Sequence, residues 1–167
     1  MRVFVPGTLP LLRALREDRL PAPLAAHAVT GALREWYVEG DGEELEYAAS
    51  SEAAAASLRL LAVDPEAPPR RVVMAAELPD EQVRPVAGSA RSAVVVGVDL
   101  TADRVVSIHV DDEEAAADVA AAARSVPAAD AGEEQAQLTV EDAEGHELLW
   151  YDVTELDDLL DDLLAGG

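Results

Sequence analysis

Three short, largely apolar runs define the expected architecture: RVVMAAE at residues 71–77, AVVVGV at 93–98 and VVSIHV at 105–110. Runs of this length, rich in valine and bounded by polar or turn-forming residues, are typical of strands buried inside a sheet. Similar but shorter patterns predict further strands at residues 3–5, 26–29 and 148–153. The sequence therefore predicts a sheet of about five to six strands.

Helical patterns alternate with these strands. We expect helices at about residues 9–18, 31–36, 43–63, 111–125, 133–143 and 154–164. The segment 133–143 has an alternative, a hairpin that turns at residues 143–145. Pro127 and Gly132 are expected to end the helix before it. Alternating strands and helices favour an α/β or α+β fold, with a mixed sheet flanked by helices in a single domain over residues 1–167.

The predicted C-terminal helix, at about 154–164, is amphipathic and acidic. Its leucines share one face and its aspartates the other: Leu156, Leu159, Leu160, Leu163 and Leu164 against Asp157, Asp158, Asp161 and Asp162. Two outcomes are open. Either the leucines pack on the sheet, or they stay exposed as a surface for a partner.

Acidic residues dominate the charge. The 167 residues hold 34 carboxylates and 12 arginines, which gives a net charge of −22. Nucleic acids and anionic membranes would be repelled, because both bind proteins through clustered lysine and arginine. Salt adaptation or a GC-rich genome accounts for this acidity, and an acidic docking face for a basic protein partner is the alternative. The N-terminus has no long apolar segment like that of a signal peptide, so we expect a cytoplasmic protein.

Missing residue types exclude several chemistries. The sequence contains no cysteine and no lysine. Disulfides, thiolate metal sites and cysteine nucleophiles are therefore excluded, as are lysine bases and Schiff bases. No cofactor is predicted, but a divalent cation remains possible.

One candidate metal site follows the strand at 105–110, where His109, Asp111 and Asp112 lie close together in sequence. Ligands often bind beyond the carboxyl ends of strands, and carboxylate oxygens suit Mg²⁺ or Mn²⁺. Acidic residues are equally common in the first turn of a helix, where they complement its dipole. The metal site would support a hydrolase-like enzyme.

A candidate ligand pocket involves both tryptophans of the chain. Each tryptophan precedes a tyrosine, in Trp36-Tyr37 and Trp150-Tyr151, and His146 lies near the second pair. If the two pairs meet, they form an aromatic patch beside carboxylates that could hold a small ligand. The alternative is that these large side chains simply fill an alanine-rich core.

Four segments carry a resemblance to a known family: RVFVPGTLPLL at 2–12, AVTGALREWYVEGDGEELEYAA at 28–49, RRVVMAAELP at 70–79 and EGHELLWYDVTEL at 144–156. Together they resemble an uncharacterised single-domain family of GC-rich, actinobacterial-type bacteria. That family has no assigned activity, so the resemblance transfers no site residues.

These observations lead to two functional hypotheses. The first is a binding or regulatory protein that acts through a small-ligand pocket or through an acidic face for a basic protein. The alternative is a metal-dependent, hydrolase-like enzyme that uses the His109 cluster. The sequence does not decide whether the protein is an enzyme, nor its oligomeric state.

Overall fold

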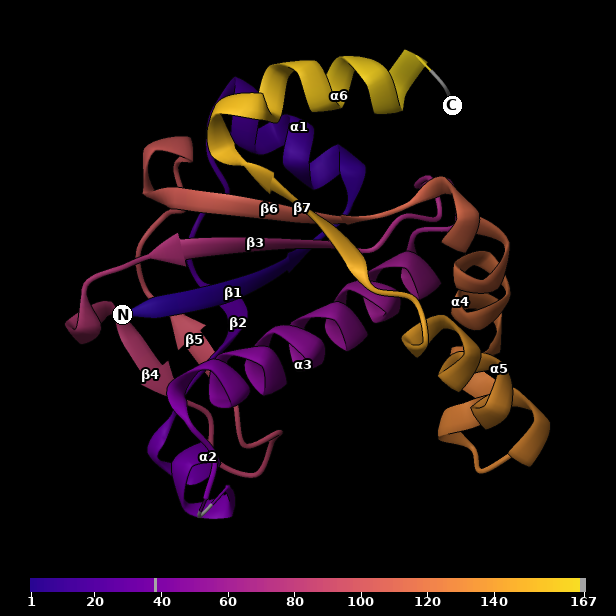
Figure 1. Cartoon of the computed structure of the whole chain (residues 1–167), viewed down its shortest axis with the longest axis horizontal. Coiled ribbons are helices and arrows are strands. Elements are labelled where there is room, and N and C mark those ends of the chain that lie inside the picture. The colour runs from indigo at the N-terminus through magenta and orange to yellow at the C-terminus, as the bar shows by residue number, and fades with distance from the viewer. Residues whose placement is uncertain (38, 166–167) are drawn as a thin grey trace.

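A seven-stranded antiparallel sheet forms the centre of the protein, with strand order β4-β5-β2-β1-β3-β6-β7 (Figure 1). The structure is a computed structural model that describes residues 1–37 and 39–165. Its strands are β1 (Arg2–Gly7), β2 (Leu24–Ala28), β3 (Val72–Glu77), β4 (Val83–Pro85), β5 (Ala93–Val96), β6 (Val105–Asp111) and β7 (Leu148–Asp152).

Helices cover both faces of this sheet and extend beyond one end of it (Figure 1). They are α1 (Leu9–Glu17), α2 (Gly31–Trp36), α3 (Gly42–Val63), α4 (Ala116–Asp130), α5 (Glu134–Glu144) and α6 (Leu156–Ala165). None of the helices in the described chain is both long enough and apolar enough to cross a membrane.

The mixed α/β class is confirmed, but the expected strand count and sheet type need correction. The described residues form seven strands rather than five to six, and every neighbouring pair is antiparallel. The missed strand is β4, which lies in a polar segment and is only three residues long. Such a short edge strand leaves little periodicity in the sequence.

The helix after β6 differs from expectation at both ends. It begins at Ala116 rather than near residue 111, because Asp111 is the last residue of β6 and Glu113–Ala115 form a 3-10 turn. Helix α4 continues through Pro127 to Asp130 instead of ending near residue 125. The chain turns at Gly132, whose φ of +93° is readily adopted by glycine. The next segment forms α5, so the helix prediction at 133–143 is correct and the alternative hairpin is not formed.

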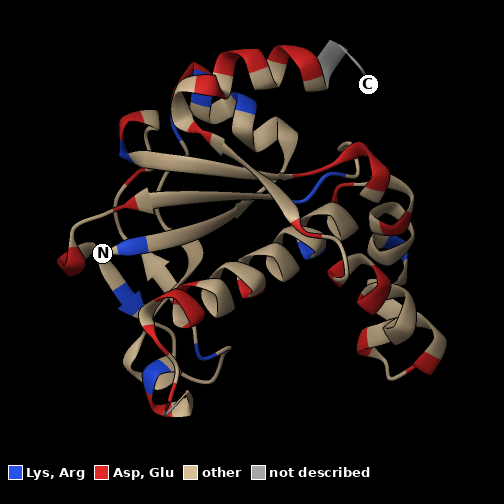
Figure 2. Cartoon of the chain, in the orientation of Figure 1, with Lys and Arg blue, Asp and Glu red and all other residues tan. Residues whose placement is uncertain are grey.

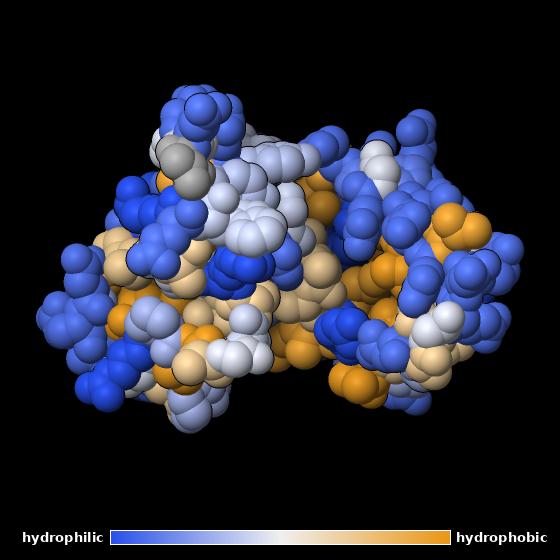
Figure 3. Space-filling model, turned by 90° about the horizontal axis from the view of Figure 1, so that it is seen from below, coloured by the Kyte–Doolittle hydropathy of each residue, from blue (hydrophilic) through white to orange (hydrophobic). Residues whose placement is uncertain are grey.

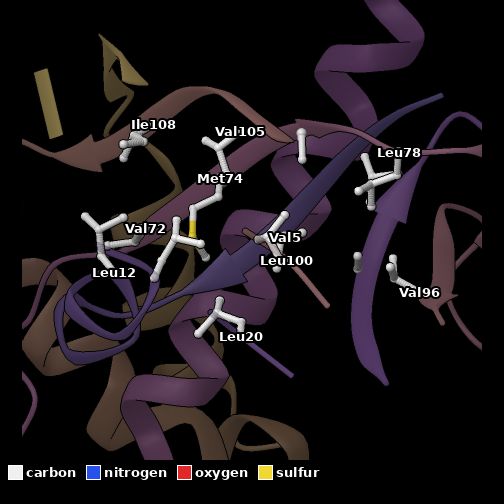
Figure 4. Packing of buried hydrophobic residues seen from close by; sticks show 14 of the residues in the cluster. Val5, Leu12, Leu20, Val72, Met74, Leu78, Val96, Leu100, Val105 and Ile108 are labelled. Atoms are coloured by element: carbon white, nitrogen blue, oxygen red, sulfur yellow. The ribbon is translucent and has the colours of Figure 1, made fainter. Parts of the chain in front are cut away.

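The largest apolar core lies between the sheet and the pair α1 and α6. Figure 4 shows its centre, where Val5, Val72, Met74 and Ile108 from three strands meet Leu12 of α1. Three leucines of α6 are buried in this core, Leu156, Leu159 and Leu160. The hypothesis of an exposed leucine face is therefore wrong for these residues. The side chain of Leu164 lies outside the described part.

Helix α3 packs against the opposite face of the sheet. Its small side chains Ala49 and Ala53 are fully buried against Phe4 of β1 and Val73 and Ala75 of β3. Alanine allows the helix backbone to approach the sheet closely. Near its C-terminal end, α3 contributes Leu58 and Leu61 to a separate small cluster with α4 and α5.

One buried hydroxyl fixes α3 to the sheet. The side chain of Ser57 donates a hydrogen bond to the Gly7 carbonyl, at 2.7 Å. The same oxygen accepts a hydrogen bond from the Val72 amide, at 2.9 Å. Ser57 is fully buried, so it satisfies two backbone groups, at the end of β1 and the start of β3, that water cannot reach.

Replacing this hydroxyl tests its role. We expect Ser57→Ala to lower the free energy of unfolding by about 1–3 kcal/mol, because two buried backbone groups lose their partner. Urea denaturation measures the change. Ser50→Ala on the same helix is the control, since Ser50 makes neither bond and should change stability by less than about 0.5 kcal/mol. Equal effects of the two variants would contradict the assignment.

Candidate functional site

A large open pocket lies between α2, the N-terminal half of α3 and the loop that precedes β5. We call it the α2–α3 pocket. Its volume is about 870 Å³. Three aromatic side chains and four carboxylates line it, together with one arginine: Trp36, Tyr37, Tyr47, Asp41, Glu43, Glu44, Glu52 and Arg91. In Figure 3, which shows this side of the molecule, hydrophobic residues are visible in patches between hydrophilic ones.

Capping residues position the walls of the α2–α3 pocket. Thr30 caps α2 by accepting a hydrogen bond from the Leu33 amide at 3.1 Å, and its hydroxyl donates to the Arg91 carbonyl. Asp41 caps α3 in the same way, through the Glu44 amide at 2.8 Å. These local bonds hold the start of α2 against the loop before β5.

The aromatic residues of this pocket remain open to solvent. Trp36 is 61% exposed and Tyr37 is 41% exposed. Leu33, one turn earlier in α2, is buried. The guanidinium of Arg91 lies over the Trp36 ring, 3.7 Å from its centroid. None of the ion pairs found among the described residues involves Arg91. Because the guanidinium lies over the face of the ring, the contact between Arg91 and Trp36 is a cation–π interaction.

A second pocket of about 630 Å³ lies on the other side of α3, toward β6 and β7. We call it the α3–β7 pocket. It shares Tyr47, Ser51 and Glu52 with the first pocket, so the two are neighbours across one stretch of α3. The Tyr47 hydroxyl donates a hydrogen bond to Glu147 at 2.8 Å, and this carboxylate raises the pKa of Tyr47.

Arg71, which lines the α3–β7 pocket, forms a buried ion pair with Asp111. Two guanidinium nitrogens of Arg71 donate to the two Asp111 oxygens at 2.8 and 2.7 Å. The Arg71 amide also donates to Asp111, at 2.8 Å. A further hydrogen bond of 2.9 Å joins the Arg71 guanidinium to the His146 carbonyl. Their side chains are 4% and 0% exposed.

The three candidate metal residues contact other partners in this structure and are not brought together as one set of ligands. Asp111 is occupied by Arg71, and Asp112 accepts a hydrogen bond from the Glu113 amide at 2.7 Å, as a helix-capping residue does. The His109 ring instead contacts the Ser107 hydroxyl through Nε2 at 3.0 Å. Within residues 1–37 and 39–165, no group of three or more acidic or histidine side chains is arranged to hold a metal ion.

The candidate pocket residues are distributed over three places. Trp36 and Tyr37 line the α2–α3 pocket, and His146 lines the α3–β7 pocket, where its Nε2 is 2.8 Å from an Asp118 oxygen. Trp150 and Tyr151 lie on β7 and line neither pocket. The two Trp-Tyr pairs therefore do not meet. Three strands, β1, β3 and β6, separate β7 from β2, the strand that leads into α2.

Sequence reasoning missed several residues of the α2–α3 pocket, above all Tyr47 and Arg91. A signal for Tyr47 was present, because Glu43, Glu44, Tyr47 and Ser51 are spaced three or four residues apart and share one helix face. Arg91 lies in a loop more than fifty residues after Trp36, and no periodic pattern in the sequence marks that loop.

The fold and its pockets define an acidic α/β protein with an aromatic, carboxylate-lined pocket beside an antiparallel sheet. The chain belongs to a family of unknown function, DUF6912, whose model matches residues 1–160. This result confirms the resemblance to an uncharacterised family. Neither curated proteins nor solved structures gave a match.

Two partly buried histidines beside the pockets make stability depend on pH. His27 contacts the Ser92 hydroxyl through Nδ1 at 2.8 Å, and burial lowers its pKa although Glu52 acts in the opposite direction. Burial also lowers the pKa of His109, and the positive charge of Arg2 adds to this effect. The unfolded chain therefore binds more protons than the folded chain once the pH falls through about 6.5.

We expect the free energy of unfolding to be fully retained above that pH and to decrease as the pH falls toward the lowered pKa values of the folded state. Urea denaturation at pH 7.5 and pH 5.5 measures the loss. The double variant His27→Gln/His109→Gln should lose less stability between these two pH values than the parent protein. An unchanged loss in the double variant would show that other groups cause it.

Proposed function

We propose that this protein binds a ligand through a positively charged group, an ammonium or a guanidinium, in the α2–α3 pocket. The observation that carries the proposal is the contact between Arg91 and Trp36, at 3.7 Å from the ring centroid. The face of Trp36 is thus already a place where a cation rests. Cation–π contacts contribute about 0.5–2 kcal/mol, depending on how far the cation is desolvated.

Carboxylates around the aromatic residues support the same ligand class. Asp41, Glu43, Glu44 and Glu52 line the pocket, and Arg91 is the one cationic side chain among the lining residues. A bound ammonium or guanidinium would donate charge-assisted hydrogen bonds to these oxygens while it contacts an aromatic face. An anionic ligand would meet four negative charges and one positive charge.

The net charge of the whole chain also favours a positively charged ligand. A net charge of −22 draws cations toward the protein from a distance and repels anions. This long-range field supports the expectation that nucleic acids are not partners, and it favours a small cationic ligand or a basic side chain of another protein. The pocket then decides which cation is retained.

Arg91 gives the proposal a distinctive consequence, because the ligand and Arg91 compete for the same ring. Removing Arg91 frees the face of Trp36 and also removes the pocket's positive charge. Removing Trp36 takes away the surface on which either cation rests. The two substitutions should therefore change affinity in opposite directions.

The probe is N-acetylarginine amide, followed by the chemical shifts of backbone amides in α2 and α3. We expect Trp36→Ala to weaken binding about 10-fold and Arg91→Ala to strengthen it several-fold. N-acetylcitrulline amide, which has the same shape without the charge, should bind much more weakly than the arginine probe.

Trp150→Ala is the matched control, since it removes the other exposed tryptophan and should leave probe binding unchanged. Equal binding of the two probes would contradict the proposal, and so would weaker binding by Arg91→Ala.

A further inference from the structure

Apart from the Asp152 amide, which donates to the Glu155 carboxylate at 2.8 Å, the outer edge of β7 is open. β7 is the last strand in the sheet order and pairs only with β6 among the strands described. In Figure 1 it crosses in front of the neighbouring strands, and no other described element is drawn in front of it. Alternate residues of an edge strand direct their amide and carbonyl groups away from the sheet, which creates a template for one more strand.

The opposite edge of the sheet, formed by β4, is protected against pairing with another chain, whereas the edge formed by β7 is not. β4 has three residues, carries Arg84 and ends at Pro85. Short length, a charged side chain and proline are the usual devices that prevent an edge from pairing with another chain. β7 has five residues, LLWYD, and within it only its last residue, Asp152, is charged.

Large apolar side chains accompany the open edge. Trp150 is 62% exposed and Leu149 is 43% exposed. Trp150 is paired with His109 and Leu149 with Val110, so the two side chains lie on opposite faces of the sheet. An added strand would cover both of them, and tryptophan is among the residues that most often dominate binding energy at interfaces.

Charge selects the kind of strand that fits. Glu147 precedes β7, Asp152 ends it, and Glu155 follows; the next helix, α6, presents aspartates to solvent. Figure 2 shows these acidic residues around β7 and along α6. A second copy of this chain would bring another net charge of −22 to the same edge. A basic strand would instead find opposite charges at both ends of β7.

We propose that β7 binds an extended, positively charged segment of another protein, which adds to the sheet as an eighth strand and covers Trp150. Main-chain hydrogen bonds to β7 supply the pairing, and Trp150 and Leu149 supply the apolar contacts. Arginine or lysine side chains of the partner pair with the acidic residues that flank β7. This docking edge is separate from the α2–α3 pocket and does not depend on the function proposed for that pocket.

The test uses the full chain and an array of eight-residue peptides in which valine or threonine alternates with a second residue. That second residue is arginine in the basic set, glutamate in the acidic set and glutamine in the neutral set. We expect the basic set to bind most strongly. The tightest peptide is then labelled, and its binding is measured by fluorescence polarisation.

Trp150→Ala should weaken this binding by at least about 10-fold, and Trp36→Ala should leave it unchanged. Trp150 is exposed, so its replacement is expected to leave the fold intact, which circular dichroism checks. Methylating the peptide amides one at a time separates strand pairing from side-chain contact alone. Strand pairing predicts that methylation weakens binding at every second position.

Three results would overturn the proposal. The first is equal binding of the three peptide sets. The second is loss of binding in Trp36→Ala but not in Trp150→Ala, which would place the peptide in the α2–α3 pocket. The third is a dimer in sedimentation velocity that Trp150→Ala dissociates, which would show that β7 pairs with a second copy.

Discussion

The buried pair of Arg71 and Asp111 is the interaction on which the α3–β7 pocket and the open edge strand depend. It joins the start of β3 to the end of β6, and through the His146 carbonyl it also holds the connection between α5 and β7. A charge buried without a partner costs several kcal/mol, so neither residue can be removed alone without large loss of stability. In the described part of the chain, no buried side-chain nitrogen or oxygen lacks a hydrogen-bond partner. The pair therefore belongs to a fully satisfied polar network, which fixes the wall of the α3–β7 pocket and the position of the open edge strand.

The few positive charges of this acidic chain have distinct structural roles. Arg71 is buried in an ion pair. Arg59 forms a bidentate ion pair with Asp130 that joins α3 to α4. That contact lowers the pKa of Asp130 and raises the pKa of Arg59, but both groups are exposed, so it adds little stability. Arg91 differs because it rests on an aromatic ring beside carboxylates. Carboxylates outnumber arginines in this chain, 34 to 12. This excess of negative charge gives both proposed sites their preference for cations.

Local patterns in the sequence predicted much of the fold. The leucine stripe of α6, the alanine-rich α3 and the valine-rich strands were all recognisable, because their periodicity arises from one element at a time. Strand order and the antiparallel pairing were not predictable, since they depend on contacts between distant segments. The role of Asp111 was missed for the same reason: its partner Arg71 lies forty residues earlier in the sequence and on another strand. The predicted aromatic patch required two pairs to meet, but alternate residues of β7 face opposite sides of the sheet, and β7 lies at the far edge.

The most direct test of this account is a double-mutant cycle on Arg71 and Asp111, measured by urea denaturation with and without Mn²⁺. Arg71→Met and Asp111→Leu should each lower the free energy of unfolding by about 3–5 kcal/mol, because each leaves a buried charge alone. The double variant should lose less than the sum of the two, with a coupling energy of about 2–3 kcal/mol. Mn²⁺ should change none of these values. Additive losses would contradict the account, as would stabilisation by Mn²⁺ that Asp111→Leu abolishes, since that result would make Asp111 a metal ligand.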